Sequence, residues 1–263
     1  GRSALVARQD LVLLHRNAEP SGSAAFLTPR TANRHHHVRA GRRDDLDRLA
    51  RGLAGGSVGI VLSGGGARGL AHIGVIEAIR ACGIPIDAIG GVSMGSIMAA
   101  QFASGMDAEA VRTACRQVFV ENRPMRDKTL PLVSLMRGLK VEDALKQSFG
   151  ESRIEDLPLP FFCCSSNLSK ASLVTHDRGL VRYGIRASMA IPGVFPPVPV
   201  DGDLLVDGGV INNGPVNILR QRFDGRVILS DVGADSPPKI DPTRGRLPGG
   251  WSLLWRRIWP FAE

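Results

Sequence analysis

Short, mostly apolar runs alternate with helix-spaced apolar stretches through the first half of the chain after residue 57. Val58–Leu62 and Ile86–Gly90 predict strands, and the first is apolar on both faces, as expected for a central parallel strand covered by helices. Each run is followed by a predicted helix, one over Gly69–Cys82 and one after Ser93. The first helix is apolar almost all round, so we expect it to be deeply buried. Strand, helix, strand, helix with short loops predicts a parallel α/β unit.

Weaker patterns predict the elements further along the chain. Leu173–Thr175 and Leu180–Arg182 flank a polar turn and predict a hairpin. Residues 122–140 contain two prolines and are expected to form an irregular cover over the site. The other predicted elements are a surface helix over 107–120, a helix over 141–149, a buried strand over Phe161–Ser165, a short helix over Arg186–Ala190, a strand over Leu204–Val206 and a last central strand over Val227–Val232.

Residues 1–56 differ from the rest and are predicted to be an N-terminal extension that leads into a core over 57–263. They contain one candidate strand, Asp10–His15, and a charged segment in which Leu46, Leu49 and Leu53 recur at helical spacing. The chain starts with glycine, so we expect it to be a piece of a longer polypeptide.

Composition narrows the class of protein. The 263 residues carry a formal net charge of +8, mostly through arginine, which favours phosphate-bearing partners. Basic residues are not interleaved with aromatic ones, so we expect no nucleic-acid partner. No apolar run reaches about 18 residues and no signal peptide is recognisable. The four cysteines form no C-x-x-C pair, so we expect buried reduced thiols, no metal and a cytoplasmic location.

Ser93 lies in the sequence Gly91-Val92-Ser93-Met94-Gly95, a G-x-S-x-G pattern between a predicted strand and a predicted helix. This pattern is typical of a nucleophile elbow, in which Gly91 and Gly95 leave room for a tight turn that exposes the serine. The pattern alone also arises by chance, but the strand before it and the buried helix after it strengthen the prediction. Ser93 is the candidate nucleophile.

A glycine-rich loop, Gly64-Gly65-Gly66-Ala67-Arg68-Gly69, follows the first strand. The same pattern occurs in dinucleotide-binding folds, which need an acidic residue at the end of the second strand. Here Asp87 is near the start of that strand, and Ser93 follows its end. A Walker loop is excluded because no Gly-Lys-Ser/Thr follows. The remaining use for these backbone amides is an oxyanion hole.

The serine needs a base, and the late histidine of a catalytic triad is missing. His176 is in a predicted polar turn, where a solvated side chain is expected, and His72 is in a buried helix, where a core hydrogen bond is expected. Asp207 is a better candidate, because it ends a strand and is followed by Gly208 and Gly209. A serine–aspartate dyad is the leading hypothesis, although Asp-Gly is also a common turn.

Two further segments have alternative interpretations. His35, His36 and His37 are adjacent, so in a strand they alternate faces and rarely bind one metal ion; we expect a structural or surface role. The tail Trp251–Trp259 combines three tryptophans with two arginines, which suits a membrane interface. A helix that packs on its own domain is an equal alternative.

These motifs, in this order, resemble the patatin-like phospholipases, and Arg186–Met189, Asp207–Asn213 and the tryptophan-rich tail resemble the neuropathy target esterase branch. The resemblance implies a three-layer α/β/α fold with a mostly parallel sheet. It assigns Ser93 as nucleophile, Asp207 as base and Gly64–Gly69 as oxyanion hole, without metal or cofactor. The implied activity is hydrolysis of phospholipid or lysophospholipid esters at a membrane surface. Members often carry upstream cyclic-nucleotide-binding-like domains. The alternative is a non-catalytic lipid-binding or regulatory domain that keeps the fold.

Overall fold

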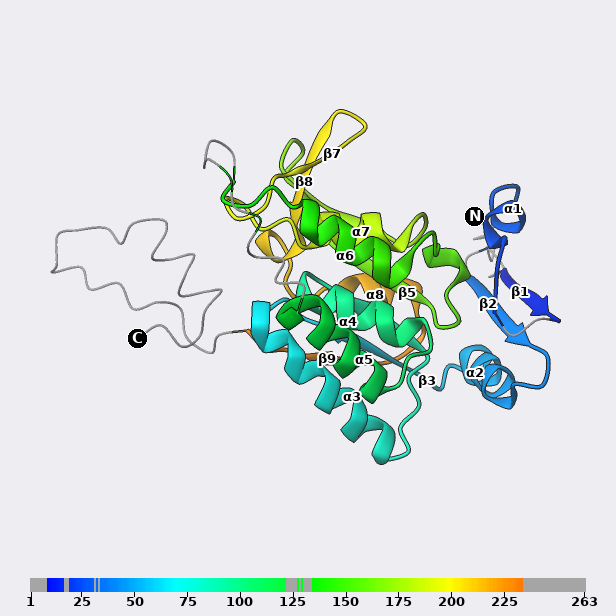
Figure 1. The fold of residues 1–263 in the computed structure, drawn as a ribbon. Helices are drawn as coiled ribbons and strands as arrows, with labels where there is room; N and C mark the ends of the chain where they lie inside the picture. The colour runs from blue at the N-terminus through cyan, green and yellow to red at the C-terminus, as the bar shows by residue number, and fades with distance from the viewer. Residues whose placement is uncertain are drawn as a thin grey trace, which may run out of the picture.

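The computed structural model describes residues 9–16, 19–30, 32, 34–121, 127, 129 and 134–233 of the chain. Most of them belong to an α/β unit built on a seven-stranded sheet (Figure 1). Its strands are β3 (Ser57–Leu62), β4 (Ala88–Gly91), β5 (Phe161–Asn167), β6 (Ser172–His176), β7 (Val198–Val200), β8 (Asp203–Asp207) and β9 (Gly225–Ser230). The order is β7-β8-β5-β4-β3-β9, and β6 pairs with β5 outside this order. β9, β3, β4 and β5 are parallel, whereas β6, β7 and β8 join antiparallel.

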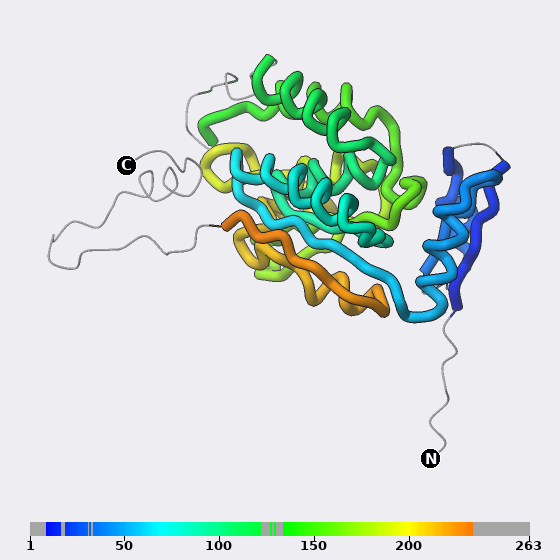
Figure 2. Tube along the Cα trace, turned by 90° about the horizontal axis from the view of Figure 1, so that it is seen from below, coloured from blue at the N-terminus to red at the C-terminus, as the bar shows by residue number. Residues whose placement is uncertain are grey.

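Helices cover both faces of this sheet, which gives the predicted three-layer α/β/α arrangement (Figure 2). One face is covered by α3 (Ala71–Ala81), α4 (Met94–Ala103), α5 (Ala108–Cys115), α6 (Leu139–Phe149) and α7 (Val181–Ser188). The other face is covered by α8 (Val216–Arg222). Cys163 belongs to the first apolar cluster and Cys164 to the second, so adjacent residues of β5 point to opposite faces.

Three expectations about helices need correction or refinement. α3 is a surface helix rather than a deeply buried one, because only His72, Ile73 and Ile76 are fully buried in it. The deeply buried helix is α4 instead, in which every residue from Gly95 to Ala103 is buried. α4 is followed by α5 and a π-helical turn, η2 (Arg116–Glu121), where the sequence predicts a surface helix over 107–120.

The predicted hairpin after β6 is wrong. β6 pairs with β5 instead, and Leu180 precedes helix α7, which spans Val181–Ser188. Burial in α7 follows the helical period of 3.6 residues rather than the strand period of 2, as shown by the buried residues Val181, Gly184, Ile185 and Ser188. The short helix predicted over Arg186–Ala190 is the last part of this longer one.

The N-terminal unit, β1 to α2, forms a separate two-stranded parallel sheet of β1 (Asp10–His15) and β2 (Arg34–Arg39) with α1 (Ser23–Leu27) and α2 (Arg43–Leu53). It contacts the core through the 3-10 turn η4 (Ile154–Asp156): the backbone N–H of Ser23 donates to Asp156 at 2.8 Å. An ion pair of 2.6 Å between Arg51 and Asp87 adds a second contact. β1 and α2 are where the sequence predicts a strand and a helix.

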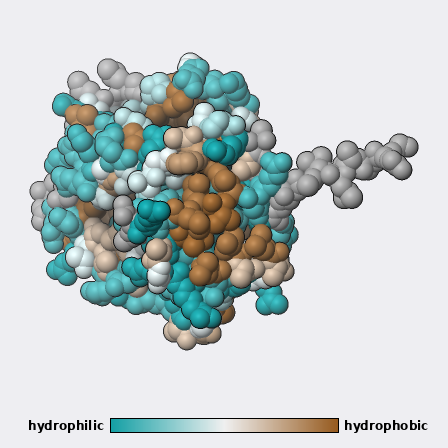
Figure 3. Space-filling view, turned by 90° about the vertical axis from the view of Figure 1, so that its right-hand side faces the viewer, coloured by the Kyte–Doolittle hydropathy of each residue, from teal (hydrophilic) through white to brown (hydrophobic). Residues whose placement is uncertain are grey.

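The apolar side of α2 does not face the core. Leu46 is 55% exposed and Leu53 67% exposed, whereas Asp45 is buried and bonded to Arg39 and Arg48. Burial opposes ionisation of Asp45, but the hydrogen bonds from Arg39 outweigh it and lower its pKa to about 2. Figure 3 shows apolar residues gathered on this side of the molecule. No helix among the described residues is long and apolar enough to cross a bilayer.

Candidate functional site

Ser93 occupies a strained turn between β4 and α4. Its φ of 53° and ψ of −123° lie in a region that non-glycine residues rarely adopt. The turn closes only because its neighbours lack side chains. A Cβ on Gly91 would lie 2.4 Å from the carbonyl oxygen of Gly95, and a Cβ on Gly95 would lie 2.3 Å from that of Leu62. The two glycines of the G-x-S-x-G pattern are therefore required by packing.

Hydrogen bonds to the backbone of Ser93 hold this turn. Its N–H donates to Oγ of Ser188, at the end of α7, at 3.0 Å. Its carbonyl oxygen accepts from Oγ of Ser96 at 2.6 Å. α4 begins at the next residue, so the positive end of the helix dipole lies at Ser93. Ser188 could not be assigned to the site from sequence, because its partner is far away in the chain.

The register of the sheet brings Asp207 to the same place as Ser93. Gly91, the last residue of β4, faces Cys163 of β5, and Asp207, the last residue of β8, faces Ser165. β6 pairs with both of these β5 residues, so β4 and β8 share the other edge of β5. The carboxyl ends of β4 and β8 thus converge, only two β5 residues or about 7 Å apart. Ser93 lies two residues beyond the end of β4, at this point of convergence.

Asp207 is fixed at the start of a second tight turn, the 3-10 turn η5 (Gly208–Val210). Its Oδ1 accepts from the N–H of Gly209 at 2.8 Å, and its own N–H donates to the carbonyl of Ala190 at 2.9 Å. A Cβ on Gly208 would lie 2.3 Å from the carbonyl oxygen of Cys164, so this position also requires glycine. Ser93 and Asp207 are each 7% exposed.

The glycine-rich loop passes directly beside Ser93. A Cβ on Gly64 would lie 3.1 Å from Cβ of Ser93. The 3-10 turn η1 (Gly66–Leu70) follows, and Gly66 begins it with a φ of 56°. In the described part of the chain, the N–H groups of Gly65, Gly66 and Ala67 have no acceptor. Later in the turn, Arg68 donates to the carbonyl of Gly65, and a Cβ on Gly69 would lie 2.4 Å from Met94. The three residues that follow Gly64, the neighbour of Ser93, therefore carry open amides.

Asn213 joins the glycine-rich loop to the Asp207 turn. Its Oδ1 accepts from the N–H of Gly64 at 3.1 Å, and its Nδ2 donates to the carbonyl of Gly64 at 2.9 Å. The same Oδ1 also packs against Gly209 of the Asp207 turn, because a Cβ added to Gly209 would lie only 2.8 Å from it. Because Gly64 donates to Asn213, its N–H is already used. Sequence reasoning missed this residue, although it follows the Asp-Gly-Gly pattern closely.

The two candidate histidines have structural partners. His72 is fully buried, and its ring bonds the carbonyl of Ser63 at 2.9 Å and Oγ of Ser230 at 2.8 Å, as a core histidine was expected to do. His176 is not a solvated turn residue, since its Nε2 lies 2.8 Å from Oγ of Ser165 and burial lowers its pKa. Burial also lowers the pKa of His72. Among the described residues, neither ring forms a hydrogen bond with Ser93; His72 bonds residues at the ends of β3 and β9, and His176 bonds a residue of β5.

The three adjacent histidines of β2 also serve as packing groups. His35 and His37 point to one side, where both rings bond the carbonyl of Glu155, at 3.2 and 2.9 Å. Among the described residues, no group of three metal-binding side chains could hold an ion. The tail Trp251–Trp259 and most of residues 122–133 lie outside the described residues.

Several known proteins are similar to this chain. Human patatin-like phospholipase domain-containing protein 6 is 34% identical over 295 residues, which cover 99% of this chain and 21% of the human protein. An uncharacterised NTE family protein of Mycobacterium tuberculosis is 43% identical over 189 residues, covering 72% of this chain and 32% of that protein. Neuropathy target esterase sws of Drosophila melanogaster is 32% identical over 297 residues, covering 100% and 21%. The chain thus spans about a fifth to a third of these relatives.

A solved structure and a family model complete the comparison. VipD from Legionella pneumophila superposes with a TM-score of 0.48 and 16% identity, covering 66% of this chain and 49% of VipD. The family model described as patatin-like phospholipase matches residues 60–220, which include Ser93, the glycine-rich loop and Asp207. On this match, the chain belongs to the patatin-like phospholipase family.

Proposed function

We propose that this chain is a serine esterase that hydrolyses acyl esters of phospholipids or lysophospholipids. The observation that carries the proposal is the convergence of three sequence-distant segments: the strained Ser93 turn, the open amides of Gly65–Ala67 and the Asp207 turn. A serine held at a positive φ is costly to maintain, and such strain is concentrated at functional sites. The names of the relatives, phospholipase and esterase, point the same way.

In the proposed reaction, Oγ of Ser93 attacks the ester carbonyl carbon while the Asp207 carboxylate accepts the hydroxyl proton. The carbonyl oxygen becomes an oxyanion, which the N–H groups of Gly65, Gly66 and Ala67 stabilise by hydrogen bonds. Collapse breaks the bond to the alcohol, which leaves with the proton from Asp207, and an acyl-enzyme remains. Water then attacks this ester, gives its proton to Asp207, and the fatty acid leaves as Ser93 recovers its proton.

A small apolar pocket, about 20 Å³ in volume, lies between helices close to Ser93. Ile97 lies one helical turn after Ser93 on α4, and Met189 directly follows Ser188, the hydrogen-bond partner of Ser93. Both line the same pocket. Its remaining lining residues come from α4, η2 and α6: Gln101, Val118, Phe119, Val141, Ala144, Leu145 and Ser148. We propose that the acyl chain extends from Ser93 between these helices.

A lipid surface is the proposed place of action. The formal net charge of +8 favours an approach to anionic head groups. The relatives are three to five times longer than the matched region, so we propose that further domains, of the cyclic-nucleotide-binding-like kind, belong to the full-length protein. Activity measured on a panel of lipids with different head groups identifies the preferred substrate.

A fluorophosphonate probe tests the nucleophile directly, because it reacts with activated serines. We expect rapid labelling of the wild type, none of Ser93→Ala, and strongly slowed labelling of Asp207→Asn. Ser104→Ala is a matched control near the end of α4, where the hydroxyl donates only to the carbonyl of Ala100, and it should label normally. Labelling that persists in Ser93→Ala would contradict the assignment. Binding to liposomes with neither labelling nor acyl release would favour the non-catalytic lipid-binding alternative.

A further inference from the structure

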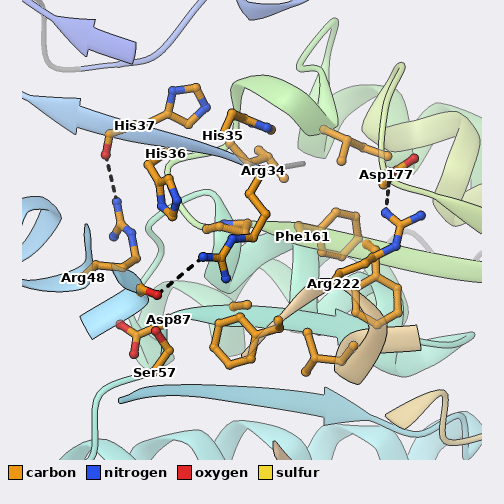
Figure 4. A pocket seen from close by; sticks show the side chains of 18 of the residues that line it. Arg34, His35, His36, His37, Arg48, Ser57, Asp87, Phe161, Asp177 and Arg222 are labelled. Atoms are coloured by element: carbon orange, nitrogen blue, oxygen red, sulfur yellow. Dashed lines mark hydrogen bonds and ion pairs between the residues drawn. The ribbon is translucent and has the colours of Figure 1, made fainter. Parts of the chain in front are cut away.

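A second cavity lies at the opposite end of the sheet from Ser93, between the N-terminal unit and the core (Figure 4). Its volume is about 160 Å³. It is lined by the first residues of β3, β4 and β5 and by β2, so it lies at the amino-terminal edge of the parallel strands. The reaction assigned to the carboxyl-terminal edge uses none of these residues.

The inner wall of this cavity is apolar and aromatic. Phe161 and Phe162 begin β5, and Leu219 and Phe223 come from the end of α8. Leu27, Ile154 and Leu157 close the side towards the N-terminal unit. A wall of this kind favours an apolar ligand body, and aromatic rings add contact area without loss of much conformational entropy.

The rim of the cavity is basic. Four arginines and two aspartates line it, together with the three histidines of β2. Figure 4 shows Arg34 extending into the middle of the cavity. Its Nη2 donates to the carboxylate of Asp10, which does not line the cavity, at 2.9 Å. Arg48 is paired with Asp45, and Arg222 with Asp177. Among the described residues, the remaining lining arginine, Arg178, has no hydrogen bond or ion pair and is exposed at the rim.

The position of Arg178 is fixed by its neighbours although its side chain is unpaired. The next residue, Gly179, donates its N–H to the Glu155 carboxylate at 2.7 Å. The carbonyl of the same Glu155 binds His35 and His37 of β2. The preceding Asp177 is held by its ion pair with Arg222. This turn therefore presents one uncompensated cation above an apolar cavity.

We propose that this cavity binds a small amphipathic anion, a carboxylate or phosphate group on a short apolar body, with the anion at Arg178 and the body against Phe161 and Phe223. The size sets the body at roughly six carbon atoms, since an apolar cavity of about 150 Å³ accommodates benzene. A bound ligand contacts both β2 and the core, so it fastens the N-terminal unit to the catalytic unit. The proposal does not depend on the chemistry of Ser93.

Titrations of the Ser93→Ala protein test this site without turnover. Hexanoate and hexyl phosphate are the two anionic probes. Hexanol is the control without a charge, and inorganic phosphate is the control without an apolar group. Calorimetry gives Kd, and hydrogen exchange reports where protection occurs. Arg178→Glu is compared with Arg220→Glu, an exposed arginine of α8 that does not line the cavity.

We expect at least one anionic probe to bind, to protect residues 34–39, and to lose at least tenfold in affinity in Arg178→Glu but less than twofold in Arg220→Glu. The tighter of the two anions identifies the natural head as carboxylate or phosphate. The proposal fails if neither anion binds, if Arg178→Glu binds as well as Arg220→Glu, or if protection maps to residues 64–69 and 207–213. It also fails if hexanol or inorganic phosphate binds as tightly as the best anionic probe.

Discussion

Replacing Asn213 by alanine removes the link between the glycine-rich loop and the Asp207 turn. Two hydrogen bonds to Gly64, of 3.1 and 2.9 Å, disappear, and the N–H and carbonyl of a buried residue lose their partners. Each unpaired buried group costs about 1–3 kcal/mol. The two groups together cost about 2–6 kcal/mol. At about 2–4 °C per kcal/mol for a domain of this size, we expect the melting temperature to fall by about 4–24 °C.

The effect on catalysis follows from the position of the open amides. Gly64 precedes the proposed oxyanion donors, so a loop released from Asn213 no longer holds them against Ser93. Loss of one whole oxyanion donor reduces kcat by about 10²–10³. Asn213 acts only through the loop, so we expect a smaller loss, about 10- to 100-fold in kcat, with KM nearly unchanged. Steady-state hydrolysis of a p-nitrophenyl ester by folded protein measures both constants.

Two further variants make this prediction specific. Asn212→Ala is the matched control. Asn212 donates to Asn217 at 2.9 Å and accepts from the N–H of Gly214 at 3.2 Å, but in the described part of the chain it forms no hydrogen bond with the glycine-rich loop, so its kcat should stay near the wild-type value. Asn213→Asp keeps an acceptor for the N–H of Gly64 but turns an oxygen towards the Gly64 carbonyl, so it should not restore activity. The reasoning is refuted if folded Asn213→Ala keeps wild-type kcat, or if its defect is confined to KM.

Three other predictions follow from the described contacts. Gly95→Ala should destabilise the fold by several kcal/mol, since its Cβ would lie 2.3 Å from the carbonyl oxygen of Leu62. Gly74→Ala, whose Cβ would have no atom within 4 Å, should instead raise the free energy of unfolding by about 0.5–1 kcal/mol. Urea unfolding measures both changes. Burial lowers the pKa of His37 to about 4, so unfolding takes up a proton below about pH 6.5. The free energy of unfolding should therefore fall as the pH drops from about 6.5 to 4. A folded His37→Gln variant whose free energy of unfolding keeps the wild-type slope against pH would contradict this. Ellman's reagent should titrate only Cys82 in native protein, because the other cysteines are buried.

The local parts of the site could be predicted from sequence, whereas its assembly could not. The two glycines that the Ser93 turn requires lie within two positions of it, so strand, glycine spacing and helix are all visible in one short segment. The meeting of Ser93 with Asp207 depends on β8 entering antiparallel on the edge of β5 that β4 has left. Sequence patterns do not give strand order or direction, so this convergence becomes visible only in the structure.

The missed residues share the same cause. Asn213 and Gly64 are 149 residues apart, and Ser93 and Ser188 are 95 residues apart, so no local pattern relates them. The wrong hairpin after β6 has a different reason. Leu180-Val181-Arg182 follows a strand and a polar turn, as the second strand of a hairpin would, but Val181 and Ile185 are buried at helical spacing in α7.

Release of fatty acid from a lysophosphatidylcholine by the purified chain tests the central claim most directly. We expect steady release by the wild type, with loss to the uncatalysed background in Ser93→Ala and at least a hundredfold decrease in Asp207→Asn, while all three remain folded by circular dichroism. Intact mass spectrometry should also find an acyl adduct on the Ser93 peptide of the wild type. Undiminished release by folded Ser93→Ala, or by folded Asp207→Asn, would contradict the proposed dyad.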